Sequence, residues 1–304
     1  MTRQSVPFAT DSAHWPEALV SKHGYARDDH IKVRAPATTG NVDTCRMFSF
    51  EFINDVDYDT TVERILADQP NDGLLPLVVT PNVDDVLQLR QPENAVLADI
   101  SHRARYVLPD GQPIVWTSRM AGRRLAARLP GSRLFGPLWE RIEADSRRVV
   151  VLAPSQMVAD RLAQQNPKAA IIVAPLFDPA DHAVLAGVVN QIWSVVQRDE
   201  TEFVILGIGF PKQQLIALGL LKKISRTPGH RPLILLLGGS LNMHTGVVPF
   251  APEWVQNYGV EFLYRFLREP RRLFHRYFVR DTAFLPLMLR EVHDIRKARI
   301  GGRE

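Results

Sequence analysis

The sequence predicts an α/β fold: a Rossmann-like parallel or mixed sheet covered by helices on both faces, followed by a basic amphipathic helical appendage at the C-terminus. Short unbroken runs of Val, Ile and Leu predict the sheet, because strands buried on both faces lack the alternation of half-exposed ones. These runs take turns with segments of helical period, which is the pattern of crossover connections between parallel strands. Arginines that gather after residue 260 predict the appendage.

The first strand is expected at 47–53, where "MFSFEFI" alternates, and a helix follows over 60–69. From residue 74 onward each apolar run precedes at least one segment of helical period. Further strands are expected at 74–80, 104–108, 147–153, 169–174, 202–209 and 232–239. Further helices are expected at 83–90, 93–102, 113–121, 132–144, 155–165, 180–198, 212–224 and 284–299.

Three regions differ in composition. Residues 1–45 are polar and broken by Pro and Gly, which predicts a poorly ordered extension. Residues 46–258 contain the predicted α/β core, and residues 259–304 form the helical appendage. With 45% apolar and 23% charged residues, the 304-residue chain has the composition of a globular protein with a sizeable core.

The cysteine content and the hydropathy of the sequence indicate the cellular compartment of the protein. Because Cys45 is the single cysteine, the chain has no internal disulfide and no cysteine-based metal site, which favours a reducing compartment. The N-terminal segment has no apolar stretch of signal-peptide length, and the longest apolar runs are shorter than the roughly 20 residues that span a bilayer. We therefore expect a cytoplasmic protein that can still lie on a membrane surface.

The positive charge is unevenly distributed. Residues 261–304 contain eleven Lys and Arg against six Asp and Glu, a net charge of +5, so the preceding residues carry −1 of the total of +4. Arg265, Arg268, Arg272 and Arg276 are spaced for one helical face. Such a segment indicates an interfacial membrane helix or a phosphate clamp, and an equally open alternative is a docked helix with a solvated basic face.

Polar residues follow several predicted strands, where ligands bind in folds of this class. "GIGFPKQQ" (207–214) places Gly207 and Gly209 where backbone could approach a ligand, with Lys212 and Gln213 beside them. The segment lacks the third glycine of a dinucleotide fingerprint and the lysine–hydroxyl pair of a Walker motif. A plain strand-to-helix turn with Pro211 in the first helical turn is the competing interpretation.

Two other strand ends carry candidates of the same kind. Thr80 and Asn82 follow one strand in "VVTPNVDD", and Asp110 follows another in "LPDG". Thr80 or Asn82 could simply cap the next helix, and Asp110 could be a turn residue. The acidic run at 55–59 has the spacing of an Asp-x-Asp metal motif, but it also suits the first turn of a helix. We expect no metal site.

Taken together, "TPNVDDV", "LPDG", "GIGFPKQQ", "APEW" and "EFLYRFLREPRR" resemble, in order and separation, the WecG/TagA/CpsF family of bacterial glycosyltransferases (glycosyltransferase family 26), over residues 47–280. The resemblance implies an inverting, metal-independent enzyme without a cofactor. It would move a sugar from a UDP-sugar to a polyprenyl-diphosphate-linked sugar at the inner face of the cytoplasmic membrane, in exopolysaccharide or cell-envelope polysaccharide assembly. It implies no nucleic-acid partner and leaves the oligomeric state open.

The resemblance also assigns roles to residues. It implies that Asp110 is the general base, that Thr80 and Asn82 line the same pocket and that Gln213 contacts donor or acceptor. Two arginines of the appendage would reach the diphosphate, namely Arg265 and Arg272. A positioned carboxylate suits the reaction because a sugar hydroxyl is weakly acidic, and arginine suits a phosphate through its planar fork of donors.

The sequence departs from the family pattern at several positions. Ala153 and Pro154 replace a usual glycine pair, Arg133 stands at a commonly acidic position, and Leu241-Asn242 replaces Phe-Asp. His275 stands at a position that is often basic. These changes favour an active but divergent enzyme. The alternative is a catalytically degenerate member that binds nucleotide-sugars or acts as a scaffold in the same pathway.

Overall fold

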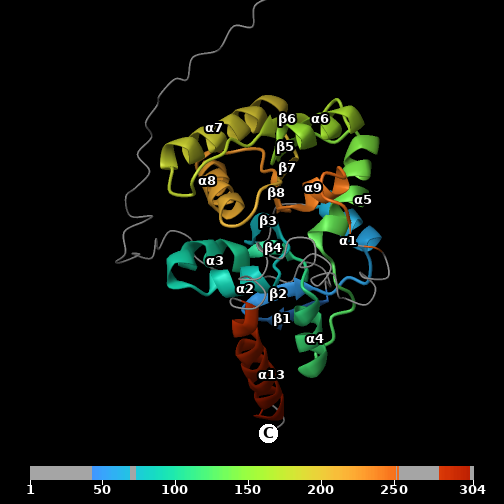
Figure 1. Ribbon diagram of the computed structural model, residues 1–304, viewed down its shortest axis with the longest axis vertical. Helices are drawn as coiled ribbons and strands as arrows, with labels where there is room; N and C mark the ends of the chain where they lie inside the picture. Colours follow the sequence, from blue (N-terminus) through green and yellow to red (C-terminus); the bar gives the residue numbers. More distant parts are fainter. Residues whose placement is uncertain (1–42, 69–72, 251, 253–280, 302–304) are drawn as a thin grey trace, which may run out of the picture.

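A computed structural model describes residues 43–68, 73–250, 252 and 281–301. Its centre is a six-stranded sheet in the order β4-β3-β8-β7-β5-β6, with every neighbouring pair parallel (Figure 1). The strands are β3 (Leu75–Val79), β4 (Ala104–Val107), β5 (Val149–Ala153), β6 (Ala170–Val173), β7 (Phe203–Leu206) and β8 (Leu233–Leu236). The predicted α/β class is confirmed, because these strands are almost wholly buried and alternate with helices.

Helices cover both faces of the sheet. One face packs against α2 (Val83–Leu89), α3 (Ala95–His102), α7 (His182–Asp199) and α8 (Lys212–Arg226). The other packs against α1 (Tyr58–Leu66), α5 (Gly131–Ala144), α6 (Gln156–Gln165) and α9 (Ser240–His244). Strand side chains alternate between these two cores: Leu77 and Val79 belong to the first, and Val78 to the second. This alternation explains why the strands lack exposed positions.

The predicted first strand is wrong in its extent. Residues 47–53 do not form one strand, because the chain turns at Phe48 and Ser49, both at positive φ (52° and 70°). The turn joins two antiparallel strands, β1 (Thr44–Met47) and β2 (Phe50–Ile53). The end of the predicted extension 1–45 thus belongs to β1, and residues 1–42 lie outside the described residues.

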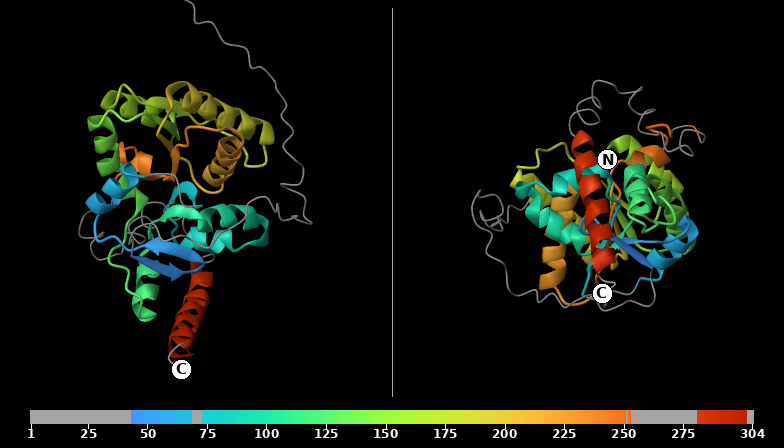
Figure 2. Two further views of the ribbon diagram at one scale, coloured as in Figure 1. Left: turned by 180° about the vertical axis from the view of Figure 1, so that it is seen from behind. Right: turned by 90° about the horizontal axis from the view of Figure 1, so that it is seen from below.

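A C-terminal helix is present, as expected. It is α13 (Phe284–Gly301), preceded by a 3-10 turn at Asp281–Ala283. The Phe284 ring lies 5.2 Å from that of Phe48, and the Phe48 N–H donates to Glu291 Oε1 at 2.8 Å, so α13 is tied to the turn between β1 and β2 (Figure 2). Within the described residues, no helix is both long enough and apolar enough to cross a membrane.

The connections divide at the centre of the sheet. β3 and β8 are neighbours, yet β3 leads into α2 on one face and β8 leads into α9 on the other. Neighbouring strands whose connections leave to opposite faces mark the point at which ligands bind in open α/β sheets. The carboxyl ends of β3 and β8, with those of β4 and β7 beside them, therefore define the place to search for a site.

Candidate functional site

Asp110 lies at the carboxyl edge of the sheet, fixed through its backbone. The Leu108 N–H donates to the carbonyl of Val79 at 2.9 Å, and the Asp110 N–H donates to that of Pro81 at 3.4 Å. These bonds extend the β3–β4 pairing beyond the last ladder residue. Half-buried Asp110 therefore lies beside the segment that carries Thr80 and Asn82, as the strand-end argument predicts. It directly precedes the Gly111 cap of α4 (Gln112–Met120).

Gly131 lies beside Thr80 and Ser240, and the sequence argument missed both Gly131 and Ser240. A Cβ atom placed on Gly131 would lie 3.1 Å from Thr80 Oγ1 and 3.2 Å from Ser240 Oγ. The first residue of α5 thus touches the ends of both β3 and β8, which only a glycine allows without displacing a hydroxyl. "LPGS" and "GGS" contain these residues, but only the sheet order brings the two segments together.

Asn82 caps α2. Its Oδ1 accepts hydrogen bonds from the N–H groups of Asp84 and Asp85, at 2.9 and 3.3 Å, while Asp85 Oδ2 accepts from the Asn82 N–H at 3.0 Å. This reciprocal pair is a capping box, which satisfies the first free donors of the helix. Asn82 therefore caps the next helix, which is the alternative interpretation of the sequence. The capping box holds Asn82 beside Asp110 and does not by itself assign it a substrate contact.

Gln213 joins the ends of β7 and β8. Its side chain is only 8% exposed, and its Oε1 accepts a hydrogen bond from the Gly238 N–H at 3.1 Å. Gly238 has a positive φ of 53°, a conformation that glycine adopts without strain. Because the amide oxygen is committed to Gly238, the amide nitrogen is the group left to contact a ligand, and it can only donate.

The two glycines of "GIGF" have different surroundings. A Cβ atom on Gly207 would lie 2.5 Å from Leu241 Cδ2 and 2.9 Å from the carbonyl of Leu152. The packing of Leu241 therefore explains Gly207, which sequence reasoning assigned to substrate. At exposed Gly209 a Cβ would have no heavy atom within 4 Å, so internal packing does not require a glycine there.

The Lys212 side chain points toward the β6 edge of the sheet, which is the edge opposite β4. Its Nζ lies 4.7 Å from the centre of the Phe177 ring, a cation–π contact with the connection between β6 and α7. Arg265 and Arg272, the arginines expected to reach a diphosphate, lie outside the described residues.

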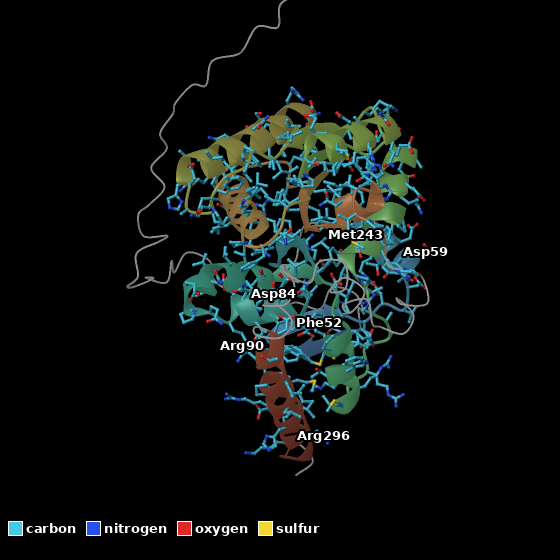
Figure 3. All side chains as sticks on the ribbon, in the orientation of Figure 1. Phe52, Asp59, Asp84, Arg90, Met243 and Arg296 are labelled. Atoms are coloured by element: carbon cyan, nitrogen blue, oxygen red, sulfur yellow. The ribbon has the colours of Figure 1, made fainter. Side chains whose placement is uncertain are left out.

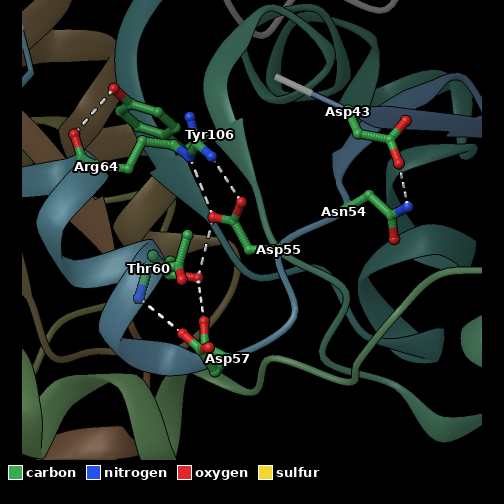
Figure 4. A network of polar contacts seen from close by, with 8 residues as sticks. Asp43, Asn54, Asp55, Asp57, Thr60, Arg64 and Tyr106 are labelled. Atoms are coloured by element: carbon green, nitrogen blue, oxygen red, sulfur yellow. Dashed lines mark hydrogen bonds and ion pairs between the residues drawn. The ribbon is translucent and has the colours of Figure 1, made fainter. Parts of the chain in front are cut away.

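The acidic run before α1 has structural roles (Figure 4). Asp57 accepts from the Thr60 N–H at 2.8 Å as the α1 cap, which lowers the pKa of its carboxyl group. Buried Asp55 accepts two hydrogen bonds from the guanidinium of Arg64, at 2.7 and 3.1 Å. Across the described part of the chain, no three His, Cys, Asp or Glu side chains gather where a metal ion could be held.

A buried polar network lies beside this run. The Tyr106 hydroxyl donates to Asp68 Oδ1 at 2.7 Å, and Asp68 also pairs with Arg105 at 2.6 Å. Burial raises the pKa of the Tyr106 hydroxyl, so Tyr106 stays neutral. Tyr106 lies on β4 four residues before Asp110, and the network braces this edge strand against α1.

Comparisons with known proteins identify a family that the chain resembles over most of its length. The family model described as "Glycosyl transferase WecG/TagA/CpsF family" matches residues 45–298. A curated protein of Staphylococcus aureus (strain MW2), named N-acetylglucosaminyldiphosphoundecaprenol N-acetyl-beta-D-mannosaminyltransferase, is 22% identical over 233 residues, covering 72% of this chain and 84% of its own. A protein of the same name from Bacillus spizizenii is 24% identical over 218 residues, covering 69% of this chain and 77% of its own.

Proposed function

The chain belongs to the WecG/TagA/CpsF family of glycosyltransferases, and we propose that it transfers a hexosyl or N-acetylhexosaminyl group from a UDP-sugar to a polyprenyl-diphosphate-linked sugar. The names of the two relatives support this substrate class, because both specify a diphosphoundecaprenol-linked acceptor and an amino-sugar donor group. The product would enter exopolysaccharide or cell-envelope polysaccharide assembly at the inner face of the cytoplasmic membrane.

The position of Asp110 carries the proposal. It is a half-buried carboxylate beyond the carboxyl end of β4, bonded through its backbone to the segment after β3. In the proposed reaction Asp110 removes the proton from the acceptor hydroxyl while the hydroxyl oxygen attacks the anomeric carbon of the donor. The bond between the anomeric carbon and the UDP oxygen breaks on the opposite side, so UDP leaves and the configuration inverts. No metal ion enters this proposal.

Other residues would bind the substrates. Thr80 and Asn82 would line the pocket beside the base, and the Gln213 amide would donate to an oxygen of donor or acceptor. Exposed Gly209 leaves its backbone open to a ligand. The diphosphate would meet Arg265 and Arg272 of the appendage, whose net positive charge would also favour an anionic membrane.

The test is the substitution Asp110→Asn, which keeps the shape of the side chain and removes the base. With a lipid-linked N-acetylglucosamine diphosphate acceptor and a panel of UDP-sugars, we expect UDP release and product to fall about 10²–10⁴-fold. The control is Asp59→Asn on the exposed face of α1, which should keep full activity (Figure 3). Undiminished turnover by the Asp110 variant would refute the assignment. A wild-type protein that binds UDP-sugars but turns none over would support the scaffold alternative.

A further inference from the structure

Gln214 is a buried polar side chain with an unused hydrogen-bond acceptor. It follows Gln213 in the first turn of α8, and the residue is only 4% exposed. Its Oε1 atom is buried and has no hydrogen-bond partner in the described part of the chain. A buried acceptor without a donor destabilises a fold, and most buried polar atoms are therefore paired. The exception at Gln214 indicates a donor that a bound molecule supplies.

The side of α8 that carries Gln214 faces away from α7. The Lys212 ammonium group lies over the Phe177 ring, just before α7. A Cβ atom on Gly219 would lie 2.7 Å from the Val189 side chain of α7. At 100° per residue, Gln214 lies roughly 140–160° around the helix from both of these positions. It therefore points to the opposite side, where α3 packs against α8 (Figure 1).

Packing between these helices does not explain a glutamine. Leu218 and Leu221 lie on the same side of α8 and pack in the hydrophobic cluster that includes α3. A leucine at position 214 would continue this contact and would leave no unpaired atom. Gln214 differs from the two leucines in its height along α8, because it lies in the turn nearest the carboxyl ends of the strands, where Gln213 bonds to the end of β8.

The order of the strands indicates which part of a substrate lies near this acceptor. α8 follows β7, and the helices that Gln214 faces follow β3, so its side chain points toward the β3 side of the site. In the proposed reaction the anomeric carbon lies near Asp110, after β4, and the diphosphate lies toward the ends of β7 and β8. The transferred sugar then lies between them. Its hydroxyl groups can donate a hydrogen bond, whereas ionised diphosphate oxygens can only accept.

We propose that Gln214 Oε1 accepts a hydrogen bond from a hydroxyl group of the transferred sugar and thereby helps to select the donor. This role rests on the proposed function, because it assumes a UDP-sugar in the site. A buried acceptor is selective because a sugar that lacks the hydroxyl, or carries it in the other configuration, leaves the amide oxygen unpaired.

The binding test is calorimetric titration of the full-length chain with UDP, UDP-glucose, UDP-N-acetylglucosamine and UDP-N-acetylmannosamine. We expect Gln214→Leu to bind UDP as the wild type does and to bind the preferred UDP-sugar about 2- to 10-fold more weakly, through loss of one neutral hydrogen bond. Gln214→Glu keeps an acceptor oxygen at the same reach and should retain more of the affinity than the leucine variant. The control is Gln191→Leu, the same substitution at an exposed position of α7, which should change neither affinity.

Thermal unfolding without ligand separates this role from a structural one. Gln214→Leu should melt at or above the wild-type temperature, because it removes an unpaired buried acceptor. A lower melting temperature would show that the amide stabilises the fold itself and would overturn the proposal.

The titrations have three outcomes that contradict the proposal. Equal affinity of the leucine variant and the wild type for every UDP-sugar would show that the amide oxygen meets only solvent. A loss of UDP affinity in the leucine variant would place its partner on the nucleotide and overturn the sugar assignment. Both results would leave the proposed function intact. A wild-type protein that binds none of the four compounds would refute the proposed function, and the role of Gln214 with it.

Discussion

Replacing Gln213 by glutamate tests the site at the level of a single hydrogen-bonding group. The Gln213 Oε1 accepts the Gly238 N–H at 3.1 Å, and a carboxylate can accept the same bond. The substitution therefore keeps the link between the ends of β7 and β8. The substitution replaces the amide NH2 group, which has two N–H donors, by a second carboxylate oxygen, which can only accept.

The magnitude follows from what each variant loses. A hydrogen bond to a charged group contributes about 1.5–3 kcal/mol, so loss of a donor to a diphosphate oxygen should weaken donor binding about 10- to 150-fold. Repulsion between the new carboxylate and the phosphate adds to this loss. The comparison variant, Gln213→Leu, removes one of the two acceptors of the Gly238 N–H, which also donates to the carbonyl of Leu206 at 3.2 Å. Loss of one such hydrogen bond should lower the free energy of unfolding by about 0.5–1.5 kcal/mol.

The assay pairs thermal unfolding with UDP titration at about pH 8, where a glutamate side chain is ionised. We expect the glutamate variant to lose UDP affinity while it melts above the leucine variant, and the leucine variant to lose both stability and affinity. A glutamate variant that binds UDP as tightly as the wild type would refute the inference that the amide nitrogen faces the ligand. A glutamate variant that melts below the leucine variant would refute the role given to the bond with Gly238.

Two further predictions concern stability. Gly207→Ala should destabilise the protein by about 1–3 kcal/mol in chemical denaturation, because the new methyl group meets Leu241. Gly209→Ala should leave the free energy of unfolding unchanged, because its methyl group meets nothing, and should lower activity if a ligand approaches there. Burial lowers the pKa of His102 and of His244, so the unfolded chain binds more protons and stability should fall as the pH drops below the ordinary histidine pKa. Melting temperatures at decreasing pH check this, and a His102→Gln, His244→Gln double variant should lose part of the dependence.

Most strands of the six-stranded sheet were predictable because they are buried on both faces, and such burial appears in the sequence as runs of Val, Ile and Leu. Their order in the sheet was not, since it depends on contacts between distant segments. The turn at Phe48 and Ser49 was missed because neither residue is typical of positive φ; the ring contact with Phe284 and the bond to Glu291 hold the turn in place. A local pattern contains no sign of either partner.

The candidate site, too, could be predicted only in part from the sequence. Strand-end polarity located Thr80, Asn82 and Asp110, because the carboxyl ends of parallel strands share one edge. Ser240 was missed, since its contact with the start of α5 depends on the pairing of β3 with β8. Gly207 was assigned to a ligand from its place at a strand end, whereas the structure gives the packing of Leu241 as the reason for a glycine there.

The order of the strands bears on how two substrates could meet. Asp110 follows the edge strand β4, whereas Gln213 and Gly238 follow β7 and β8 farther into the sheet. A lipid-linked acceptor that approaches along the β4 edge would therefore reach Asp110 first, with a donor bound over β8 and β7 beyond it. Inversion requires the acceptor oxygen and the leaving UDP on opposite sides of the anomeric carbon. A base on the edge strand, between an acceptor that arrives there and the donor, satisfies that requirement without either substrate crossing the other.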